Sequence, residues 1–328
     1  MKKKTAIITG ISGQDGAYLA EFLLKKNYKV IGTDRRSARS NFWRLRRLGI
    51  ENKINYEEME LGENCEIDRL FKKYKNVDEV YNLAAQSFVA TSFNSPINTS
   101  NITALGTLRI LEAIRNYNKK IKFYQASSSE MFGRSVDKNG YQSETTKFEP
   151  TSPYGCAKVF AFNLVKHYRF AYNLFCSNGI LFNHESPRRG ANFVTNKVIK
   201  TAVEIKLGLR KKLYLGNLDS YRDWGHSKDY VRAMYLILKH KKPDDFVIAT
   251  GNTRSIRQLC KVVFENLNLD YKKYVAQQKK FLRPEELKYL RGDSSKAKKV
   301  LKWKPEITFE QMVKEMTEFW LKYYNKEA

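Results

Sequence analysis

A tyrosine and a lysine four residues apart are the groups of this sequence best suited to proton chemistry. Tyr154 and Lys158 stand in the segment Ser-Pro-Tyr-Gly-Cys-Ala-Lys, and on a helix they share one face. Tyrosine titrates near pH 10, so it acts as a base near neutrality only if its anion is stabilised. An ammonium ~4 Å away predicts a pKa lowered by about two to three units. The hydroxyl of Ser128 can hydrogen-bond the substrate group that Tyr154 deprotonates.

Glu130, two residues after Ser128, adds a second base to this set. Transfer of a hydride to or from a nicotinamide ring needs one proton acceptor, so a further carboxylate favours elimination of water over simple redox chemistry. Two plainer interpretations stay open at this point. Glu130 could be a loop acid that caps a helix, and Tyr154 with Lys158 could be a surface pair.

A glycine-rich turn near the start of the chain predicts a dinucleotide site. Three glycines spaced G-x-x-G-x-x-G follow a short β-branched run and precede a helical pattern. Glycine allows a tight turn and a close approach to a pyrophosphate, and the amides of the next helix attract the anion. The residues expected to contact the cofactor here are Gly10, Ile11, Gly13, Gln14, Asp15 and Gly16.

The choice of cofactor should be decided after the second strand. Asp34 suits the ribose hydroxyls of NAD, whereas Arg35, Arg36 and Ser37 suit the 2′-phosphate of NADP. The two arginines favour NADP, with NAD left possible by the acid. The alternative for the arginines is a solvated basic loop.

Strands and helices must alternate to position these groups. Periodicity predicts strands at 5–9, 28–33, 79–83 and 122–126, and helices at 17–26, 67–74, 103–116 and 309–323. This order predicts an α/β fold with a doubly wound parallel sheet, in which ligands bind at the carboxyl ends of the strands. We expect a dinucleotide-binding domain over residues 1–180 and a smaller, mixed substrate domain over 181–328, interleaved with the first.

Composition narrows the class further. The four cysteines are scattered without a C-x-x-C pair, which predicts no zinc site, no disulfide framework and a reducing, cytoplasmic location. No apolar run approaches the roughly 18 residues of a membrane span, so no membrane partner is expected. The net charge of +26 would suit a nucleic-acid binder. The lysines are spread along the whole chain without a nucleic-acid motif, so we predict a basic surface that attracts an anionic substrate.

Several segments resemble a known family. The glycine loop, Ser128, Tyr154 and Lys158 are similar to the extended short-chain dehydrogenase/reductase superfamily. Within it the chain resembles the GDP-mannose 4,6-dehydratases. The segments that carry this resemblance nearly span the chain: 9–16, 123–133, 179–190, 215–225, 283–286 and 303–305. The segment 183–190 is the most specific, because generic members of the superfamily lack it.

The resemblance implies a reaction and a set of contacts. Tyr154 would deprotonate the C4 hydroxyl of the hexose, and Glu130 would take the C5 proton and protonate the departing C6 hydroxyl. The family usually has threonine at Ser128, aspartate at Glu60 and no acid at Asp34. Further cofactor contacts would be Glu60, Leu61, Leu83, Ala84, Ala85, Gln86, Ser87, His184 and Arg189, besides Tyr154 and Lys158. Contacts to the GDP-sugar would be Ser87, Ser128, Glu130, Asn183, Val194, Lys197, Arg222, Arg283 and Glu286.

The resemblance also implies a homodimer or homotetramer, because in the family the loop at 35–43 reaches a neighbouring subunit. Phe42 and Trp43 would suit such an interface, or they could belong to a helix that packs within its own chain. Related activities stay open: a GDP-heptose 4,6-dehydratase, a 4-reductase or an epimerase. A basic nucleic-acid-binding protein on the same fold is the alternative from a different class, and the intact Ser128, Tyr154 and Lys158 argue against it.

Overall fold

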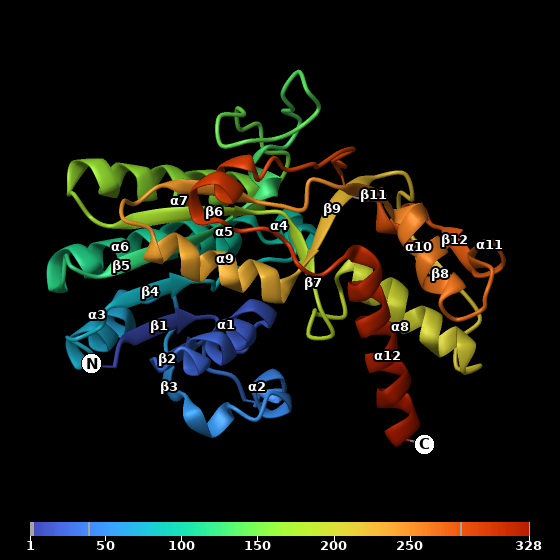
Figure 1. The fold of residues 1–328 in the computed structure, drawn as a ribbon, viewed down its shortest axis with the longest axis horizontal. Helices are drawn as coiled ribbons and strands as arrows, with labels where there is room; N and C mark the ends of the chain where they lie inside the picture. Colours follow the sequence, from blue (N-terminus) through green and yellow to red (C-terminus); the bar gives the residue numbers. More distant parts are fainter. Residues whose placement is uncertain (1–2, 39, 283, 328) are drawn as a thin grey trace.

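Seven parallel strands form the central sheet of the molecule. Figure 1 shows a computed structural model of the chain, which describes residues 3–38, 40–282 and 284–327. Each pair of neighbouring strands in the sheet is parallel. From one edge to the other the strands are β10 (Asp245–Ile248), β6 (Cys176–Leu181), β5 (Lys122–Ser128), β4 (Glu79–Asn82), β1 (Thr5–Thr9), β2 (Lys29–Asp34) and β3 (Asn55–Glu58). The predicted doubly wound α/β sheet is confirmed.

Helices cover both faces of this sheet because successive side chains of a strand point to opposite faces. In β1, Ile8 packs into the apolar layer beneath one set of helices, and Ile7 packs into the layer on the other face. The helices of the first face are α1 (Gln14–Lys25) and α9 (Ser227–Lys239). Those of the second are α3 (Asn64–Lys73), α6 (Gly106–Tyr117) and α7 (Pro153–Ala171).

A smaller mixed part lies beside the carboxyl end of the sheet (Figure 1). Its three-stranded sheet contains β7 (Asn183–Glu185), β9 (Tyr221–His226) and β11 (Thr253–Ser255), with β7 parallel and β11 antiparallel to β9. A two-stranded parallel sheet pairs β8 (Leu213–Leu215) with β12 (Val275–Gln277). Three helices pack their apolar faces around Trp224: α8 (Val194–Lys206), α10 (Ile256–Glu265) and α12 (Phe309–Glu327).

The chain crosses between the two parts more than once. After β7, the chain returns to the central sheet with α9 and β10, and β10 pairs with β6. The edge strand of the larger sheet therefore comes from beyond residue 181. The division into two domains at residue 180 remains a prediction. The crossing means that residues from both predicted domains contribute strands to the central sheet.

The ends of several elements differ from the expectation. Helix α1 begins at Gln14 rather than 17, because Gly13 is extended and the helix starts directly after the turn. Strand β5 runs on to Ser128, and a π-helical stretch at Asn101–Leu105 precedes α6. Apolar periodicity missed these polar first and last residues. The pattern also left out the short helices α2 (Trp43–Arg47), α4 (Val89–Asn94), α5 (Pro96–Ser100) and α11 (Tyr271–Tyr274).

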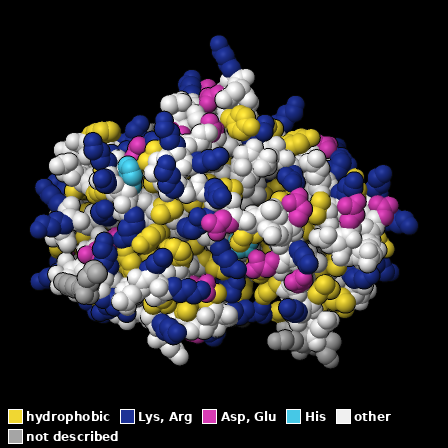
Figure 2. Space-filling model, viewed as in Figure 1, with side chains coloured by type: hydrophobic (Ala, Val, Ile, Leu, Met, Phe, Trp, Pro, Cys, Tyr) yellow, Lys and Arg dark blue, Asp and Glu magenta, His cyan; other side chains and the backbone are white. Residues whose placement is uncertain are grey.

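Lysine and arginine side chains are scattered over the face of the molecule drawn in Figure 2, rather than gathered into one stripe. Acidic side chains lie among them on the same face. Among the described residues, no helix has the length and apolar character needed to cross a membrane. Within the same ranges, no cluster of three or more histidine, cysteine or acidic side chains is arranged to hold a metal ion.

Candidate active site

A large cavity of about 1240 Å³ lies between the central sheet and the smaller part. Small-molecule sites usually occupy about 300–1,000 Å³, so this cavity is larger than a typical site for one ligand. Segments from both halves of the chain line it, from Gly10 near the start to Glu286 near the end. As expected for a parallel sheet, the cavity faces the carboxyl ends of the strands.

The glycine loop forms one end of the cavity. Gly10 has a left-handed backbone (φ 70°), and a Cβ there would lie 3.0 Å from the Cα of Ala84. A Cβ on Gly16 would lie 2.3 Å from the carbonyl oxygen of Gly10, so helix α1 can start this close to the turn only with glycine. The loop is thus a bare backbone surface, shaped for the close approach of a pyrophosphate. Ile11 is fully buried in the core and does not line the cavity.

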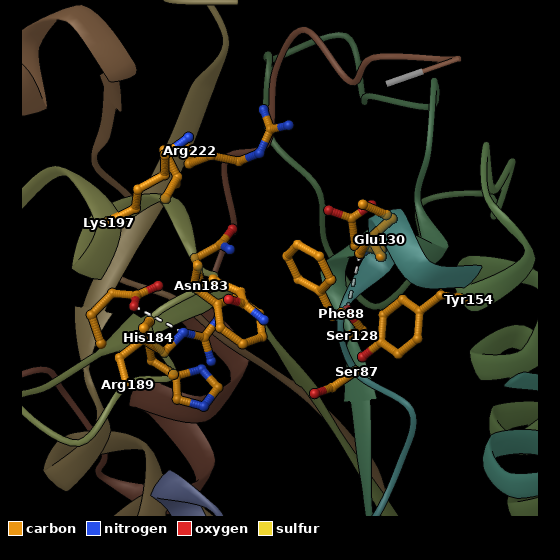
Figure 3. A pocket seen from close by; sticks show the side chains of 18 of the residues that line it. Ser87, Phe88, Ser128, Glu130, Tyr154, Asn183, His184, Arg189, Lys197 and Arg222 are labelled. Carbon is orange, nitrogen blue, oxygen red and sulfur yellow. Dashed lines mark hydrogen bonds and ion pairs between the residues drawn. The ribbon is translucent and has the colours of Figure 1, made fainter. Parts of the chain in front are cut away.

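Ser128, Glu130, Tyr154 and Lys158 meet on the side of the cavity formed by the central sheet. We call these four residues the sheet wall. Strand β5 ends at Ser128, whose hydroxyl accepts a hydrogen bond from the amide of Glu130 at 3.2 Å. Tyr154 lies in the first turn of α7, which Ser152 caps by accepting from the amide of Gly155. Figure 3 shows Ser128, Glu130 and Tyr154 on the same side of the pocket.

The electrostatics of Tyr154 differ from the expectation. Burial raises the pKa of Tyr154 to about 12. A hydrogen bond with Ser128 lowers this pKa, and the negative charge of Glu130 raises it. Burial also lowers the pKa of Lys158 to about 8. The ammonium of Lys158 donates to the carbonyl of Ala126 at 2.6 Å and lies 5.7 Å from the Tyr154 ring centre. The prediction that Lys158 lowers the pKa of Tyr154 is therefore wrong for this arrangement, because burial outweighs the opposing effects and the ammonium is hydrogen-bonded to the carbonyl of Ala126.

The opposite side of the cavity is cationic. We call it the basic wall: Asn183, Arg189, Lys197, Arg222 and Glu286, all of which line the cavity. Figure 3 shows Asn183, Arg189, Lys197 and Arg222 across the pocket from Tyr154. The guanidinium of Arg222 donates to the carbonyl of Leu287 at 2.8 Å and to Glu286 at 3.3 Å. Lys197 donates to the carbonyl of Tyr214 at 2.7 Å and lies 3.8 Å from the centre of the Phe281 ring.

Most of the remaining predicted site residues also reach the cavity. Leu83, Ala85, Ser87, His184 and Val194 line it, as do Gln14 and Asp15 of the glycine loop. The side chains of Gln14 and Asp15 do not extend freely into the space, however. The amide of Gln14 donates to the carbonyl of His184 at 3.1 Å, and the carboxylate of Asp15 pairs with the ring of His184 at 2.7 Å.

Other predicted residues lie outside the cavity lining. Asp34 accepts hydrogen bonds from the hydroxyl of Ser12 and, at 2.9 Å, from the amide of Arg35. Arg35, Arg36 and Ser37 are exposed beyond the end of β2. The set not in the lining comprises Ile11, Asp34, Arg35, Arg36, Ser37, Glu60, Leu61, Ala84 and Gln86. Arg283 lies outside the described residues.

Glu60, Leu61, Ala84 and Gln86 have structural partners. The amide of Glu60 donates to Glu66 at 2.6 Å, and Leu61 is buried in the apolar layer between the sheet and α6. The amide of Ala84 donates to the hydroxyl of Thr9 at 3.0 Å. The side chain of Gln86 donates to the carbonyl of Phe88 at 3.2 Å. These contacts fix the loops that surround the glycine turn.

Sequence reasoning missed several residues of the cavity. Arg44 donates to the carbonyls of Ser12 at 3.0 Å and Arg188 at 2.8 Å, and its burial beside Arg189 and Arg188 lowers its pKa to about 10. No local signal marks it, because it follows the glycine loop by some 30 residues in an unassigned helix.

An aromatic pair in the cavity was also missed. The rings of Phe88 and Phe193 meet edge to face with centres 5.6 Å apart, and the guanidinium of Arg189 lies 3.5 Å from the Phe193 ring centre. Each aromatic residue alone looks like an ordinary core position. Only the fold brings the two rings together across the cavity.

A glycine loop at the carboxyl edge of a parallel sheet, beside a serine, a tyrosine and a lysine, defines a short-chain dehydrogenase/reductase of the extended type. Solved structures share this fold. Over 98% of this chain and 99% of the other, UDP-glucose 4-epimerase from Thermotoga maritima superposes with a TM-score of 0.86 at 24% identity. The dTDP-glucose 4,6-dehydratase from Streptomyces venezuelae also gives 0.86, at 19% identity over 98% of each chain.

The chain belongs to the GDP-mannose 4,6-dehydratase family. A family model described as GDP-mannose 4,6 dehydratase matches residues 7–316. GDP-mannose 4,6 dehydratase 1 of Arabidopsis thaliana is 47% identical over 96% of this chain and 89% of its own length. The Homo sapiens GDP-mannose 4,6 dehydratase is 44% identical over 96% of this chain and 90% of its own. A Vibrio cholerae GDP-mannose 4,6-dehydratase is 43% identical over 99% and 96%.

Proposed function

We propose that this protein is a GDP-mannose 4,6-dehydratase, a lyase that converts GDP-mannose to GDP-4-keto-6-deoxymannose. The position of Glu130 carries the proposal. Its carboxylate lies in the same cavity as Tyr154 and Lys158, opposite a basic wall suited to a diphosphate. A tyrosine–lysine pair alone would serve a dehydrogenase. A second carboxylate beside it serves the loss of water.

Two ligands are proposed for the two ends of the cavity. The bare glycine loop, where a Cβ on Gly10 or Gly16 would meet backbone atoms, fits the pyrophosphate of a nicotinamide dinucleotide. Gly10, Gly13, Gly16, Leu83, Ala85 and Ser87 would surround this cofactor. The GDP-sugar would lie against Asn183, Val194, Lys197, Arg222 and Glu286, with its hexose near Ser128 and Glu130. The bound nicotinamide would accept a hydride from C4 of the sugar and return it to C6.

The residues of the sheet wall handle the protons. Tyr154 removes the proton of the C4 hydroxyl, and the Ser128 hydroxyl orients that oxygen. The resulting 4-ketone acidifies C5, whose proton passes to Glu130. Glu130 then protonates the C6 oxygen, which departs as water. Of the two protons removed from the sugar, one leaves with the water and one returns to C5, so the reaction is balanced.

Lys158 must change its partner for Tyr154 to work as a base. In this structure its ammonium is bound to the carbonyl of Ala126, and the pKa of Tyr154 is raised. A shift of the ammonium towards the phenol oxygen would stabilise the phenolate, because opposite charges ~4 Å apart gain a few kcal/mol at intermediate dielectric. We therefore assign the activation of Tyr154 to a rearrangement of Lys158 that accompanies ligand binding.

We propose NADP as the preferred cofactor. The hydroxyl of Ser12 and the amide of Arg35 already occupy the carboxylate of Asp34, which reduces its capacity to accept from ribose hydroxyls. Arg35, Arg36 and Ser37 are exposed at the same edge of the sheet, where a 2′-phosphate would extend. NAD remains the alternative because of Asp34.

The assembly and location of the protein stay predictions: a cytoplasmic homodimer or homotetramer, with a dinucleotide-binding domain and a substrate domain that interleave. Within one chain, Phe42 packs edge to face on Tyr56 with ring centres 4.7 Å apart. Trp43 lies beside Arg47, with 5.7 Å from the guanidinium to a ring centre, and Arg47 in turn lies 4.8 Å from the ring centre of Phe319 in α12. These contacts favour packing within the chain for part of the segment that was considered for an interface.

The experiment that tests the function is a turnover assay with product mass analysis. Incubation with GDP-mannose and a catalytic amount of NADP⁺ should give a product about 18 mass units lighter, with no accumulation of NADPH. Formation of one NADPH per product molecule would contradict the dehydratase proposal. GDP-heptoses run in parallel decide whether the sugar is a hexose or a heptose.

A further inference from the structure

His184 has an acceptor at each of its two ring nitrogens. Its Nε2 lies 2.7 Å from a carboxylate oxygen of Asp15, and its Nδ1 lies 2.7 Å from the carbonyl oxygen of Phe182. A carbonyl oxygen only accepts, so Nδ1 carries a proton, and an ionised carboxylate likewise receives a proton from Nε2. The ring also stacks on Tyr230, with centres 4.4 Å apart and planes 21° apart. The geometry is that of an imidazolium in a charged pair.

The titration of the pair agrees with this geometry. Burial lowers the pKa of His184, but the charge and hydrogen bond of Asp15 outweigh it, and the net direction is upwards. Burial raises the pKa of Asp15, but the charge and hydrogen bond of His184 outweigh the effect of burial, so the pKa of Asp15 is lowered overall. Arg189 also faces both groups. Both shifts favour the charged form of the group concerned.

A second contact runs beside this ion pair. Ser186 donates its hydroxyl to the side chain of Gln14 at 2.6 Å, and Gln14 donates to the carbonyl of His184. Two consecutive residues at the start of α1 are thus bound to alternate residues of the segment that begins with β7. Because side chains alternate along a strand, Asn183 is presented to the other side of β7 from His184, and both residues line the cavity. Figure 3 shows His184 and Asn183 extending in different directions.

Asp15 lies where a carboxylate is costly for the proposed cofactor. It belongs to the first turn of α1, directly behind Gly13, where the helix amides attract an anion. A bare carboxylate at this position would repel a pyrophosphate. The imidazolium of His184 cancels its charge, so a state with His184 in contact favours the dinucleotide. The same contact fixes β7, which carries Asn183 of the basic wall.

We propose that the Asp15–His184 ion pair couples binding of the dinucleotide to binding of the nucleotide sugar, with both residues acting as positioning residues. The proposal rests on the proposed function, since it takes a nicotinamide dinucleotide and a GDP-sugar as the two ligands. Coupling of this kind is reciprocal: if the nucleotide sugar increases the affinity for the dinucleotide by some factor, the dinucleotide increases the affinity for the nucleotide sugar by the same factor. The pair joins the glycine-loop end of the cavity to β7, which carries Asn183 of the basic wall, so its removal should separate the two binding events.

The test is titration calorimetry of NADP⁺ with and without saturating GDP, which replaces the sugar substrate and prevents turnover. In the unaltered protein, GDP should tighten NADP⁺ binding by roughly tenfold, within the usual range of coupling factors. His184→Gln removes the cation that contacts the Asp15 carboxylate and leaves Arg189 as the charge that faces it, so NADP⁺ alone should bind roughly tenfold more weakly, and the effect of GDP should disappear. Asp15→Asn should keep the affinity for NADP⁺ alone within about threefold yet also lose the effect of GDP.

The double variant Asp15→Asn/His184→Gln separates charge from structure. If the carboxylate causes the weak binding in His184→Gln, its removal should restore the affinity for NADP⁺ alone. A double variant no better than His184→Gln would overturn the electrostatic part of the proposal. Coupling of normal size in both single variants would overturn the proposal itself. Absence of coupling in the unaltered protein would also overturn it, whereas failure of that protein to bind NADP⁺ or GDP would count against the proposed function.

The chain offers a matched control. His226 and Glu315 form another histidine–carboxylate pair at 2.8 Å, between β9 and α12, and neither residue lines the cavity. Glu315→Gln should leave the coupling factor unchanged. If the single variants at Asp15 and His184 do not fold, the double variant Asp15→Asn/His184→Gln carries the test, because it replaces the ion pair by two neutral side chains of similar shape. It should lose the effect of GDP on NADP⁺ binding, and coupling of normal size in it would overturn the proposal.

Discussion

The two walls of the cavity are built in different ways. The sheet wall takes Ser128, Glu130, Tyr154 and Lys158 from two short stretches, one at the end of β5 and one in the first turns of α7. The basic wall collects Asn183, Arg189, Lys197, Arg222 and Glu286 from separate elements spread over about a hundred residues. Chemistry depends on distances fixed by local geometry. Binding of a long anionic ligand depends on charges that only the tertiary fold assembles.

The walls also differ in how their charges are held. Lys158 is buried and has its pKa lowered, and Glu130 is buried beside Tyr154. On the basic wall, Lys197 and Arg222 both line the cavity, and each is held by a hydrogen bond to a backbone carbonyl. Substitutions in the sheet wall should therefore affect turnover, and those in the basic wall should affect binding. Four predictions test this difference.

The largest effect is expected for Glu130→Gln. Loss of a positioned general acid–base costs about 10²–10⁴-fold, and here one group serves two proton transfers, so turnover should fall at least about 10³-fold. Binding of NADP⁺ and GDP by calorimetry should stay within about threefold, since Gln keeps the shape of the side chain. Glu149→Gln, at an exposed carboxylate outside the cavity lining, is the control and should remain active. Near-normal turnover of Glu130→Gln would show that another group removes the C5 proton.

Arg222→Ala should produce the opposite pattern. Hydrogen bonds to a charged group contribute about 1.5–3 kcal/mol, so the affinity for GDP should fall roughly 10- to 100-fold. NADP⁺ binding should not change. Arg254→Ala on the neighbouring strand β11 removes an arginine that pairs with Glu310 at 2.8 Å and should leave GDP binding unaltered. A defect in NADP⁺ binding of equal size would break the division between the two walls.

Lys158→Met should stabilise the protein although it removes a residue of the sheet wall. Burial lowers the pKa of Lys158 from 10.5 to about 8, so the protonated lysine costs about 3 kcal/mol at pH 7. Against this, the carbonyl of Ala126 loses its donor, at about 1 kcal/mol, which leaves a net gain of about 2 kcal/mol.

The pH dependence of this gain has a definite sign. Between pH 8 and 10.5 the unfolded chain binds more protons at Lys158 than the folded chain, so the stability contributed by this group rises with pH. Urea unfolding should therefore show the advantage of Lys158→Met at pH 7 and a smaller advantage at pH 9.5. An equal difference at both values would show that the lysine is not held in this destabilised state.

The smallest effect is expected for Arg36→Ala, at an exposed side chain outside both walls. Loss of one arginine–phosphate contact should weaken NADP⁺ binding roughly tenfold and leave NAD⁺ binding unchanged. Asp34→Ala should change the NAD⁺ affinity more than the NADP⁺ affinity. Tighter binding of NAD⁺ than NADP⁺ by the unaltered protein would reverse the cofactor proposal.

Patterns in the sequence predicted the parallel α/β fold, the glycine loop and the residues of the sheet wall, although the strands β3, β6 and β10 were not predicted by range. Each rests on short-range rules: the period of two in strands, a glycine where a Cβ would meet backbone, and four-residue spacing on a helix. Ser128, Glu130, Tyr154 and Lys158 could be chosen from such spacing, and the cavity contains all four.

The pairing of charges in the cavity could not be predicted from the sequence and became visible in the folded chain. Residues 15 and 184 are brought into contact because α1 and β7 both pack against α9, which no local pattern encodes. The ammonium of Lys158 is directed to Ala126, whereas spacing alone placed it beside Tyr154. Arg44, Phe88 and Phe193 also line the cavity because of the path of the chain, and no local pattern marks them. The physical reason is that periodicity reports which face of an element is buried, whereas the partner of a buried charge depends on the path of the whole chain.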